Sequence, residues 1–213
     1  YVRGNGTLPD RKLVSAVKAA QEHGYTTGST GWGYTWDPEK AKQLVLRTHT
    51  TALSARTLAR LKPSDLPAKF FSVGRCFRNE AVDWKHLIEF DHAEGIVVGE
   101  GLTFRHLLGY LREFFTKMGF PDVRFRPSYF PYVEPGLECE VYHPARKQWI
   151  ELGGAGILRP EVVAPLLGKN VTVLAWGLGL GRLIMDRLEI KDLRDFHQND
   201  LKQLQEMKVW VDN

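Results

Sequence analysis

The sequence predicts an α/β protein of the α+β type, in which a mostly antiparallel sheet is flanked by helices. Two observations predict this class. Strand-like runs in the middle of the chain are joined by hairpins as much as by helices, which favours antiparallel pairing. Around these runs, apolar residues recur at the three- and four-residue spacing of helices. No repeat or low-complexity tract divides the chain, so one domain over residues 1–213 is expected.

The N-terminal part is predicted to be helical with irregular connections. A helix is expected from Asp10 to Gly24, because aspartate caps helix starts and glycine ends helices. Residues 25–36, rich in Gly, Thr and aromatics, predict a loop or a short irregular strand. A second helix is expected at Pro38, a residue suited to the first helical position. A third is expected to end near Leu61, before a Pro-containing segment.

The middle of the chain is predicted to form strands. Runs at 70–78 and 86–100 are expected to pair as a hairpin with a long polar tip. Thr103 is expected to cap a helix whose apolar stripe ends at Gly119. The remaining expected elements are strands at 123–135, 137–144 and 147–157, a helix at 160–168, a buried strand at 171–176, and helices at 179–188 and 199–208.

Composition and sequence pattern exclude collagen, coiled-coil, disordered and membrane proteins. The net charge of +4 permits a polyanionic partner but does not argue for one. Two cysteines, Cys76 and Cys139, cannot build a disulfide framework, so a reducing, cytoplasmic location is expected. No apolar run approaches the roughly 20 residues of a membrane span, so no membrane association is expected. The chain begins at Tyr1 and not at Met, which suggests a fragment.

Charged residues gather on the predicted strands. Arg78 and Glu80 are two residues apart and share a face if their strand continues. The next strand is expected to place five side chains on one face: His86, Ile88, Phe90, His92 and Glu94. A ring beside an arginine suits a purine and its phosphates. An amphipathic sheet whose polar face meets water explains the same pattern, and both interpretations stay open.

The segment at 177–182, GLGLGR, predicts a close backbone approach followed by a cation. It is not a dinucleotide-binding loop, because Arg182 stands where the third glycine of that motif belongs. Arg182 is expected to open a helix, either as a solvated helix-end arginine or as a cation placed to neutralise a bound polyphosphate. Neither H-E-x-x-H nor C-x-x-C occurs, so a metal site built by the protein alone is not expected.

Taken together, these segments resemble a known family. Phe77-Arg78-Asn79-Glu80, followed by His86 and Phe90, resembles motif 2 of class II aminoacyl-tRNA synthetases, and 177–182 is similar to their motif 3. Three further segments resemble the catalytic core of the phenylalanyl-tRNA synthetase α subunit in its archaeal-type form: RTHTTA (47–52), RPSYFPYVEPG (126–136) and ELGGAGILRPEV (151–162). The resemblance covers essentially the whole chain. It implies the class II catalytic fold and a phenylalanine–tRNA ligase, which forms phenylalanyl-adenylate from ATP and phenylalanine.

The resemblance also implies roles at the nucleotide. Arg78 is expected to bind the α-phosphate and to stabilise charge that develops on phosphorus during attack, and Arg182 is the second catalytic residue. Glu80 is expected to accept a hydrogen bond from the adenine amino group. Phe90 and Arg182 are expected to sandwich the adenine, and His86 to lie near the outer phosphates.

For the amino acid, the resemblance implies that Phe130 and Tyr132 meet the substrate ring edge to face, although core aromatics explain the same residues. Ala155 matches the small residue that lines the ring pocket. The polar end of the pocket is expected from His49, Thr51, His92 and Glu94, with Glu94 pairing with the substrate ammonium.

Cofactors and partners follow from the same resemblance. Mg²⁺ is expected at Glu151, with Glu138 and Glu140 as weaker candidates, and ATP is expected to supply most of its oxygen ligands. tRNA(Phe) is the expected acceptor in the second step. A β subunit, giving the heterotetramer of the family, or a homodimer is the expected assembly.

Three departures from the family pattern keep two alternatives open. His92 stands where relatives have glutamine, and a histidine is expected to change charge near neutral pH. Gly181 stands where relatives often have a carboxylate. Motif 1 and the N-terminal tRNA-contacting extension are absent from the sequence. The alternatives are a non-catalytic amino-acid-binding paralogue and a core that activates a different amino acid, with His92, Tyr132 and Gly136 reshaping the pocket.

Overall fold

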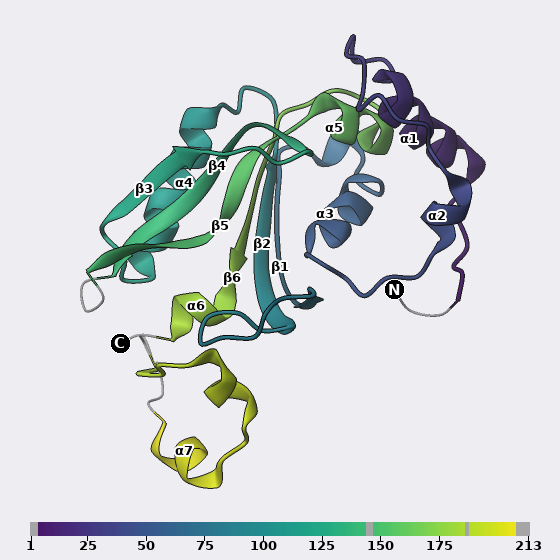
Figure 1. Ribbon diagram of the computed structural model, residues 1–213. Helices are drawn as coiled ribbons and strands as arrows, with labels where there is room; N and C mark the ends of the chain where they lie inside the picture. The colour runs from purple at the N-terminus through teal and green to yellow at the C-terminus, as the bar shows by residue number, and fades with distance from the viewer. Residues whose placement is uncertain (1–3, 144–146, 186–187, 208–213) are drawn as a thin grey trace.

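A computed structural model describes residues 4–143, 147–185 and 188–207, and its centre is a six-stranded sheet (Figure 1). The strands are β1 Ala68–Phe77, β2 Glu89–Val98, β3 Val123–Pro127, β4 Val133–His143, β5 Gln148–Leu158 and β6 Val173–Gly179. Their order across the sheet is β1-β2-β6-β5-β4-β3, and every neighbouring pair is antiparallel. The predicted antiparallel α+β class is therefore confirmed.

The ends of the helices follow from local capping chemistry. The helices are α1 Arg11–His23, α2 Pro38–Lys42, α3 Thr51–Leu58, α4 Phe104–Lys117, α5 Pro160–Leu167, α6 Leu180–Ile184 and α7 Leu201–Glu206, with 3₁₀ turns η1 Pro63–Asp65 and η3 Leu193–His197. The Asp10 carboxylate accepts hydrogen bonds from the first free N–H groups of α1. Gly24 ends α1 with a φ of 80°, a left-handed conformation that glycine adopts without strain.

The two faces of the sheet bury separate apolar clusters. Because side chains alternate along a strand, Val97 and Leu174 pack under α4, whereas Ile96 and Val173 pack on the other face with α3 and α5 (Figure 1). Phe115 of α4 is fully buried in the first cluster. The apolar stripe predicted for this helix is therefore the core of that face.

The hairpin between β1 and β2 corrects one prediction. β1 ends at Phe77 and β2 begins at Glu89, so Arg78, Glu80 and His86 lie in the connection and not on strands. The connection turns at Asp83, whose carboxylate accepts hydrogen bonds from the backbone N–H groups of the two residues that follow Trp84. The polar tip is therefore longer than predicted, although backbone hydrogen bonds from Arg78 to Ile88 and from Asp83 to His86 still link its two sides.

A second correction concerns the strand expected at 123–135. β3 ends at Pro127, and a tight turn brings the Val133 N–H to the Phe130 carbonyl oxygen at 3.3 Å before β4 begins. Phe130 and Tyr132 therefore lie in or beside a turn, and strand alternation does not place them.

Three predicted helices are shorter than expected. α3 ends at Leu58, α6 is described only from Leu180 to Ile184, and α7 spans Leu201–Glu206. Residues 186–187 and 208, part of two predicted helices, lie outside the described residues.

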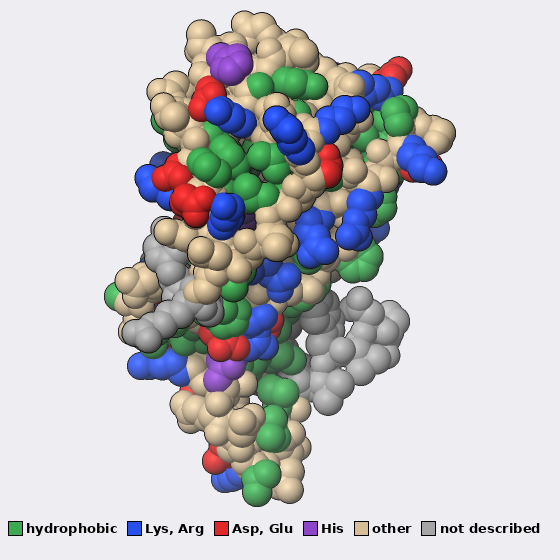
Figure 2. All heavy atoms as spheres, turned by 90° about the vertical axis from the view of Figure 1, so that its right-hand side faces the viewer, with side chains coloured by type: hydrophobic (Ala, Val, Ile, Leu, Met, Phe, Trp, Pro, Cys, Tyr) green, Lys and Arg blue, Asp and Glu red, His purple; other side chains and the backbone are tan. Residues whose placement is uncertain are grey.

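Three further observations concern the cysteines, the charged surface and the length of the helices. Cys76 and Cys139 are free thiols buried in the fold. Figure 2 shows Lys and Arg side chains spread over one face with acidic and apolar side chains between them, as a mild net charge of +4 would give. Among the described helices, none has the length and apolar character needed to cross a membrane.

Candidate active site

A cavity of about 560 Å³ lies against β2, β5 and β6. This volume is in the range typical of small-molecule sites. It gathers every residue that the sequence assigns to the nucleotide, the amino acid or the favoured Mg²⁺ position. These are His49, Thr51, Arg78, Glu80, His86, Phe90, His92, Glu94, Phe130, Tyr132, Glu151, Ala155 and Arg182. The predicted set therefore shares one cavity.

Glycine backbone forms part of the cavity floor. Gly154 of β5 pairs with Gly177 of β6 in the sheet register. A Cβ atom at position 154 would lie 2.6 Å from Phe130 Cζ, and one at position 177 would lie 2.6 Å from His92 Cε1. The absence of both Cβ atoms lets these two rings rest directly on the strands.

Glu94 is a buried carboxylate held by hydroxyl groups. It is 4% exposed, and it accepts hydrogen bonds from Thr50 Oγ1 at 3.0 Å, Thr51 Oγ1 at 2.7 Å and Ser54 Oγ. The start of α3 packs against β2 and delivers all three hydroxyls. Within the described residues no lysine or arginine forms an ion pair with Glu94. Such a carboxylate suits a cationic ligand group.

His92 lies beside Glu94 on β2 and is 7% exposed. Its Nδ1 atom is 2.7 Å from Thr50 Oγ1. Burial lowers the pKa of His92 from 6.5 to about 4, and the positive charges of Arg78 and His49 add to this effect. His92 is therefore neutral at neutral pH, and the expectation that its charge changes there is wrong.

The aromatic wall of the cavity consists of Phe130 and Tyr132. Their ring centroids are 6.2 Å apart, and His49 stacks on Tyr132 at 5.8 Å. Burial also lowers the pKa of His49, although Glu94 opposes this shift. The turn that carries the wall is fixed from outside, because Trp32 Nε1 donates a hydrogen bond to the Pro131 carbonyl at 3.0 Å.

Trp32 has no predicted role in the sequence, where residues 25–36 are expected only to form a loop or a short irregular strand. A tryptophan between glycines in a polar loop was the available signal, since an indole N–H usually finds a partner. Thr50 and Ser54 were also missed. A hydroxyl on a helix start has many possible partners, and only the fold brings these two to Glu94.

Two arginines also line the cavity. The Arg78 guanidinium lies 5.1 Å from the Phe90 ring centroid, and its Nε donates to the Thr48 carbonyl at 3.1 Å. Arg182 donates to the carbonyl oxygens of Lys85 and Glu151, each at 3.1 Å. Arg182 thus ties the hairpin tip to β5. The guanidinium over Phe90 is that of Arg78, whereas the sequence predicts Arg182 on the far side of a bound adenine.

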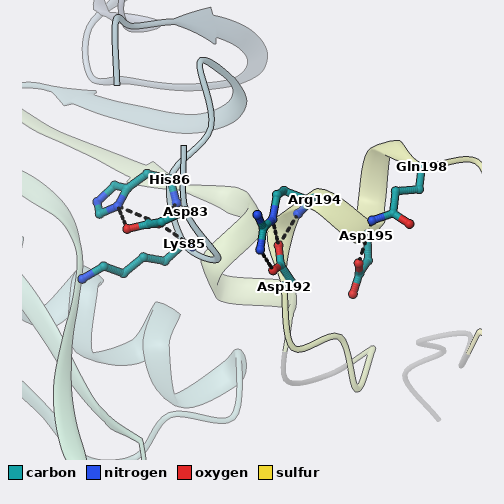
Figure 3. Close-up of polar contacts among 7 residues, drawn as sticks. All are labelled: Asp83, Lys85, His86, Asp192, Arg194, Asp195 and Gln198. Carbon is teal, nitrogen blue, oxygen red and sulfur yellow. Dashed lines mark hydrogen bonds and ion pairs between the residues drawn. The ribbon is translucent and has the colours of Figure 1, made fainter. Parts of the chain in front are cut away.

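The hairpin tip also holds His86 (Figure 3). Its Nδ1 lies 3.0 Å from each carboxylate oxygen of Asp83, and this hydrogen bond lowers the pKa of Asp83. Across from it, η3 is capped by Asp192, which pairs with Arg194. The Leu193 N–H donates a hydrogen bond to the Trp84 carbonyl oxygen at 2.9 Å. This contact holds η3 against the hairpin tip. This segment, which also lines the cavity, has no predicted role in the sequence.

The three acidic Mg²⁺ candidates separate in the structure. Glu151 is exposed on β5 and lines the cavity. Glu138 accepts a hydrogen bond from Ser128 Oγ, and Glu140 pairs with arginines of β3, so these weaker candidates are engaged elsewhere. No three metal-ligating side chains cluster among the described residues. An exposed carboxylate such as Glu151 fits Mg²⁺ as one ligand when nucleotide oxygens provide the others.

Ala155 borders the cavity, but its side chain points away from it. It packs with Leu137 in the cluster under α4, on the opposite face of the sheet. Ala175 of β6 pairs with Gly156 and belongs to the cluster that contacts Phe130. The alanine side chain on the pocket face is therefore that of Ala175. The sequence misleads here because a run of glycines hides the alternation of β5.

Comparison with known proteins identifies the family of this chain. The chain belongs to the family described as tRNA synthetases class II core domain (F), whose model matches residues 14–207. Within that family, it is similar to the phenylalanine–tRNA ligase alpha subunits of three organisms. Identity is 55% for Methanothermobacter thermautotrophicus, 54% for Archaeoglobus fulgidus and 53% for Methanopyrus kandleri.

These alignments cover 96%, 93% and 94% of this chain, respectively, and 39%, 41% and 38% of the relatives. The chain therefore spans about two fifths of the length of the curated relatives it matches.

Proposed function

We propose that this chain is the adenylate-forming core of a phenylalanine–tRNA ligase. It binds ATP and phenylalanine and forms phenylalanyl-adenylate with release of pyrophosphate. The observation that carries this proposal is the single cavity whose lining includes both the Arg78–Phe90 pair and Glu94 with the aromatic wall. The names of the relatives support phenylalanine as the amino acid.

The amino-acid end accounts for recognition of phenylalanine. Glu94 binds the α-ammonium, because this buried carboxylate is held by hydroxyl donors and no described lysine or arginine forms an ion pair with it. Phe130 and Tyr132 contact the substrate ring, and ring pairs of this kind contribute about 0.5–1.5 kcal/mol beyond burial. Ala175 limits the depth of the ring pocket from β6.

The nucleotide end accounts for the chemistry. The carboxylate oxygen of phenylalanine attacks the α-phosphorus, a P–O bond forms, and the bond to pyrophosphate breaks. Arg78 stabilises the charge that develops on the phosphate oxygens. Its guanidinium lies over the Phe90 ring and gives up this contact when adenine stacks on the ring. His86, held by Asp83, meets the outer phosphates. Glu151, together with phosphate oxygens of the nucleotide, would hold Mg²⁺, which would supply neutralising charge for the leaving pyrophosphate.

The second step involves partners. We assign transfer of the phenylalanyl group to the 2′-hydroxyl of tRNA(Phe), in the cytoplasm, to this core acting within a complete ligase. A β subunit is the partner, since the relatives are named alpha subunits.

Phenylalanine-dependent ATP–pyrophosphate exchange tests the proposal, with a panel of twenty amino acids and Arg78→Ala as the control. We expect exchange with phenylalanine that the control lacks. Exchange with another amino acid alone would refute phenylalanine as the substrate. Calorimetric phenylalanine binding without exchange would refute catalytic activity and favour a binding paralogue.

The ring pocket has its own matched pair of variants. Ala175→Gly is expected to admit para-substituted phenylalanines in the exchange assay, whereas Ala155→Gly is not, since its side chain lies in the cluster under α4. Equal effects of both variants would contradict the assignment of Ala175 to the pocket face.

A further inference from the structure

We propose that Thr50 fixes the ring tautomer of His92, so that His92 Nε2 and Glu94 act together as two hydrogen-bond acceptors for the substrate amino group. The placement of the amino group rests on the proposed function, whereas the tautomer does not. Thr50 is fully buried, and its hydroxyl lies between the other two side chains.

The direction of the hydrogen bonds follows from what each group can donate. Thr50 Oγ1 is 3.0 Å from a Glu94 carboxylate oxygen and 2.7 Å from His92 Nδ1. A hydroxyl has one hydrogen, and an ionised carboxylate only accepts. If the Thr50 hydrogen went to His92, two oxygens bearing lone pairs would face each other in a buried site, which is costly. The hydrogen therefore goes to Glu94, and His92 Nδ1–H donates to Thr50 Oγ1.

One other contact bears on this assignment. The Thr50 backbone N–H approaches His92 Nδ1 at 3.4 Å. This N–H points toward Nδ1 and by itself favours a lone pair there. At 3.4 Å it is longer and weaker than the side-chain contact at 2.7 Å, and we take the shorter contact as the one that sets the proton position.

The other ring nitrogen then carries a lone pair. His92 is neutral, because burial lowers its pKa to about 4, and a neutral ring protonated on Nδ1 accepts hydrogen bonds at Nε2. Nε2 lies at the cavity floor, where a Cβ on Gly177 would come within 2.9 Å of it. The ring also makes an edge contact with Phe90, with centroids 6.3 Å apart. The His92 ring therefore lies between Phe90 on one side and Thr50 with Glu94 on the other.

A substrate with three N–H donors fits this pair of acceptors. An ammonium can donate one hydrogen to Glu94 and another to His92 Nε2, whereas an α-hydroxy analogue has only one hydrogen to give. His92 is in this sense a specificity residue, and Thr50 is the positioning residue that acts through it. A glutamine at position 92 presents its own carbonyl oxygen and does not require a fixed tautomer.

The first experiment measures the tautomer directly. Long-range ¹H–¹⁵N spectra of the imidazole groups are recorded without ligand, and the His92 signals are assigned from their loss in His92→Gln. We expect a protonated Nδ1 and an unprotonated Nε2. In Thr50→Val, which keeps the shape and removes the hydroxyl, the protonated Nε2 form is expected to appear, while Thr50→Ser keeps the original spectrum.

The second experiment measures phenylalanine binding by calorimetry in a double-mutant cycle. Thr50→Val is expected to weaken binding by about 10- to 100-fold, because a hydrogen-bonded charged site is disturbed, and Thr50→Ser by much less. In the His92→Gln background the loss caused by Thr50→Val is expected to be smaller, since only the bond to Glu94 is then lost.

The outcomes separate the two levels of the proposal. A protonated Nε2 in the unmodified protein would overturn the tautomer assignment even if Thr50→Val failed to fold. Equal losses in both backgrounds would show that Thr50 acts through Glu94 alone and would also overturn it. The expected tautomer without phenylalanine binding would instead refute the proposed function and the two-acceptor site, leaving the tautomer intact.

Discussion

Acidification is expected to destabilise the fold through His92. Its pKa lies near 6.5 in the unfolded chain and at about 4 in the folded protein, because burial disfavours the imidazolium. Below pH 6.5, His92 is protonated in the unfolded chain but stays neutral in the folded protein. The free energy of unfolding therefore falls as pH falls. The loss is absent at pH 7 and is nearly complete at pH 4.

The size of the effect follows from the displacement of the pKa. A change from 6.5 to about 4 corresponds to about 3 kcal/mol, at 1.36 kcal/mol for each unit. This is a large part of the roughly 5–15 kcal/mol by which domains are stable. His49, whose pKa is also lowered by burial, adds to the acid sensitivity.

Urea unfolding of the unmodified protein and of His92→Gln at pH 7 and pH 4 isolates this contribution. Glutamine does not titrate in this pH range, and His49 contributes to the pH dependence of both proteins. The stability of His92→Gln relative to the unmodified protein is therefore expected to improve by about 3 kcal/mol between pH 7 and pH 4. The same pH dependence in both proteins would refute the assignment of a buried neutral ring.

Three further changes test packing and capping. Gly154→Ala places a Cβ 2.6 Å from Phe130 Cζ, so the KM for phenylalanine in pyrophosphate exchange is expected to rise about tenfold or more; an unchanged KM would contradict the packed aromatic wall. Phe115→Ala removes a fully buried ring and is expected to lower the free energy of unfolding by about 3–5 kcal/mol in urea titrations, and a loss below 1 kcal/mol would place this ring outside the core. Asp10→Ala is expected to cost about 1 kcal/mol by the same measurement, whereas Asp10→Ser keeps the cap, and equal losses would argue against capping.

Local chemistry made much of the fold predictable. Asp10 and Gly24 bound α1 as expected, and Pro38 and Pro160 begin their helices. These signals work because each depends on backbone groups within a few residues. The antiparallel class was also predictable, because strands joined by hairpins as much as by helices favour antiparallel pairing.

Contacts that depend on the fold were less predictable. The candidate site residues were found from a resemblance in motifs, and the structure places them in one cavity. Their partners were not found, since Thr50, Ser54 and Trp32 act through contacts with residues distant in sequence. A register shift of β4 against β5 between Cys139 and Glu140 also escapes the sequence.

The glycine floor of the cavity restricts how the site can change. Every substitution at Gly154 or Gly177 adds atoms, and the nearest atoms at both positions belong to rings that line the cavity. Mutation of the floor can therefore only shrink the cavity or displace those rings. New substrate preferences are consequently easier to acquire through side chains that can be trimmed, such as Ala175, Phe130 and Tyr132, so the evolutionary freedom of this site lies in its walls.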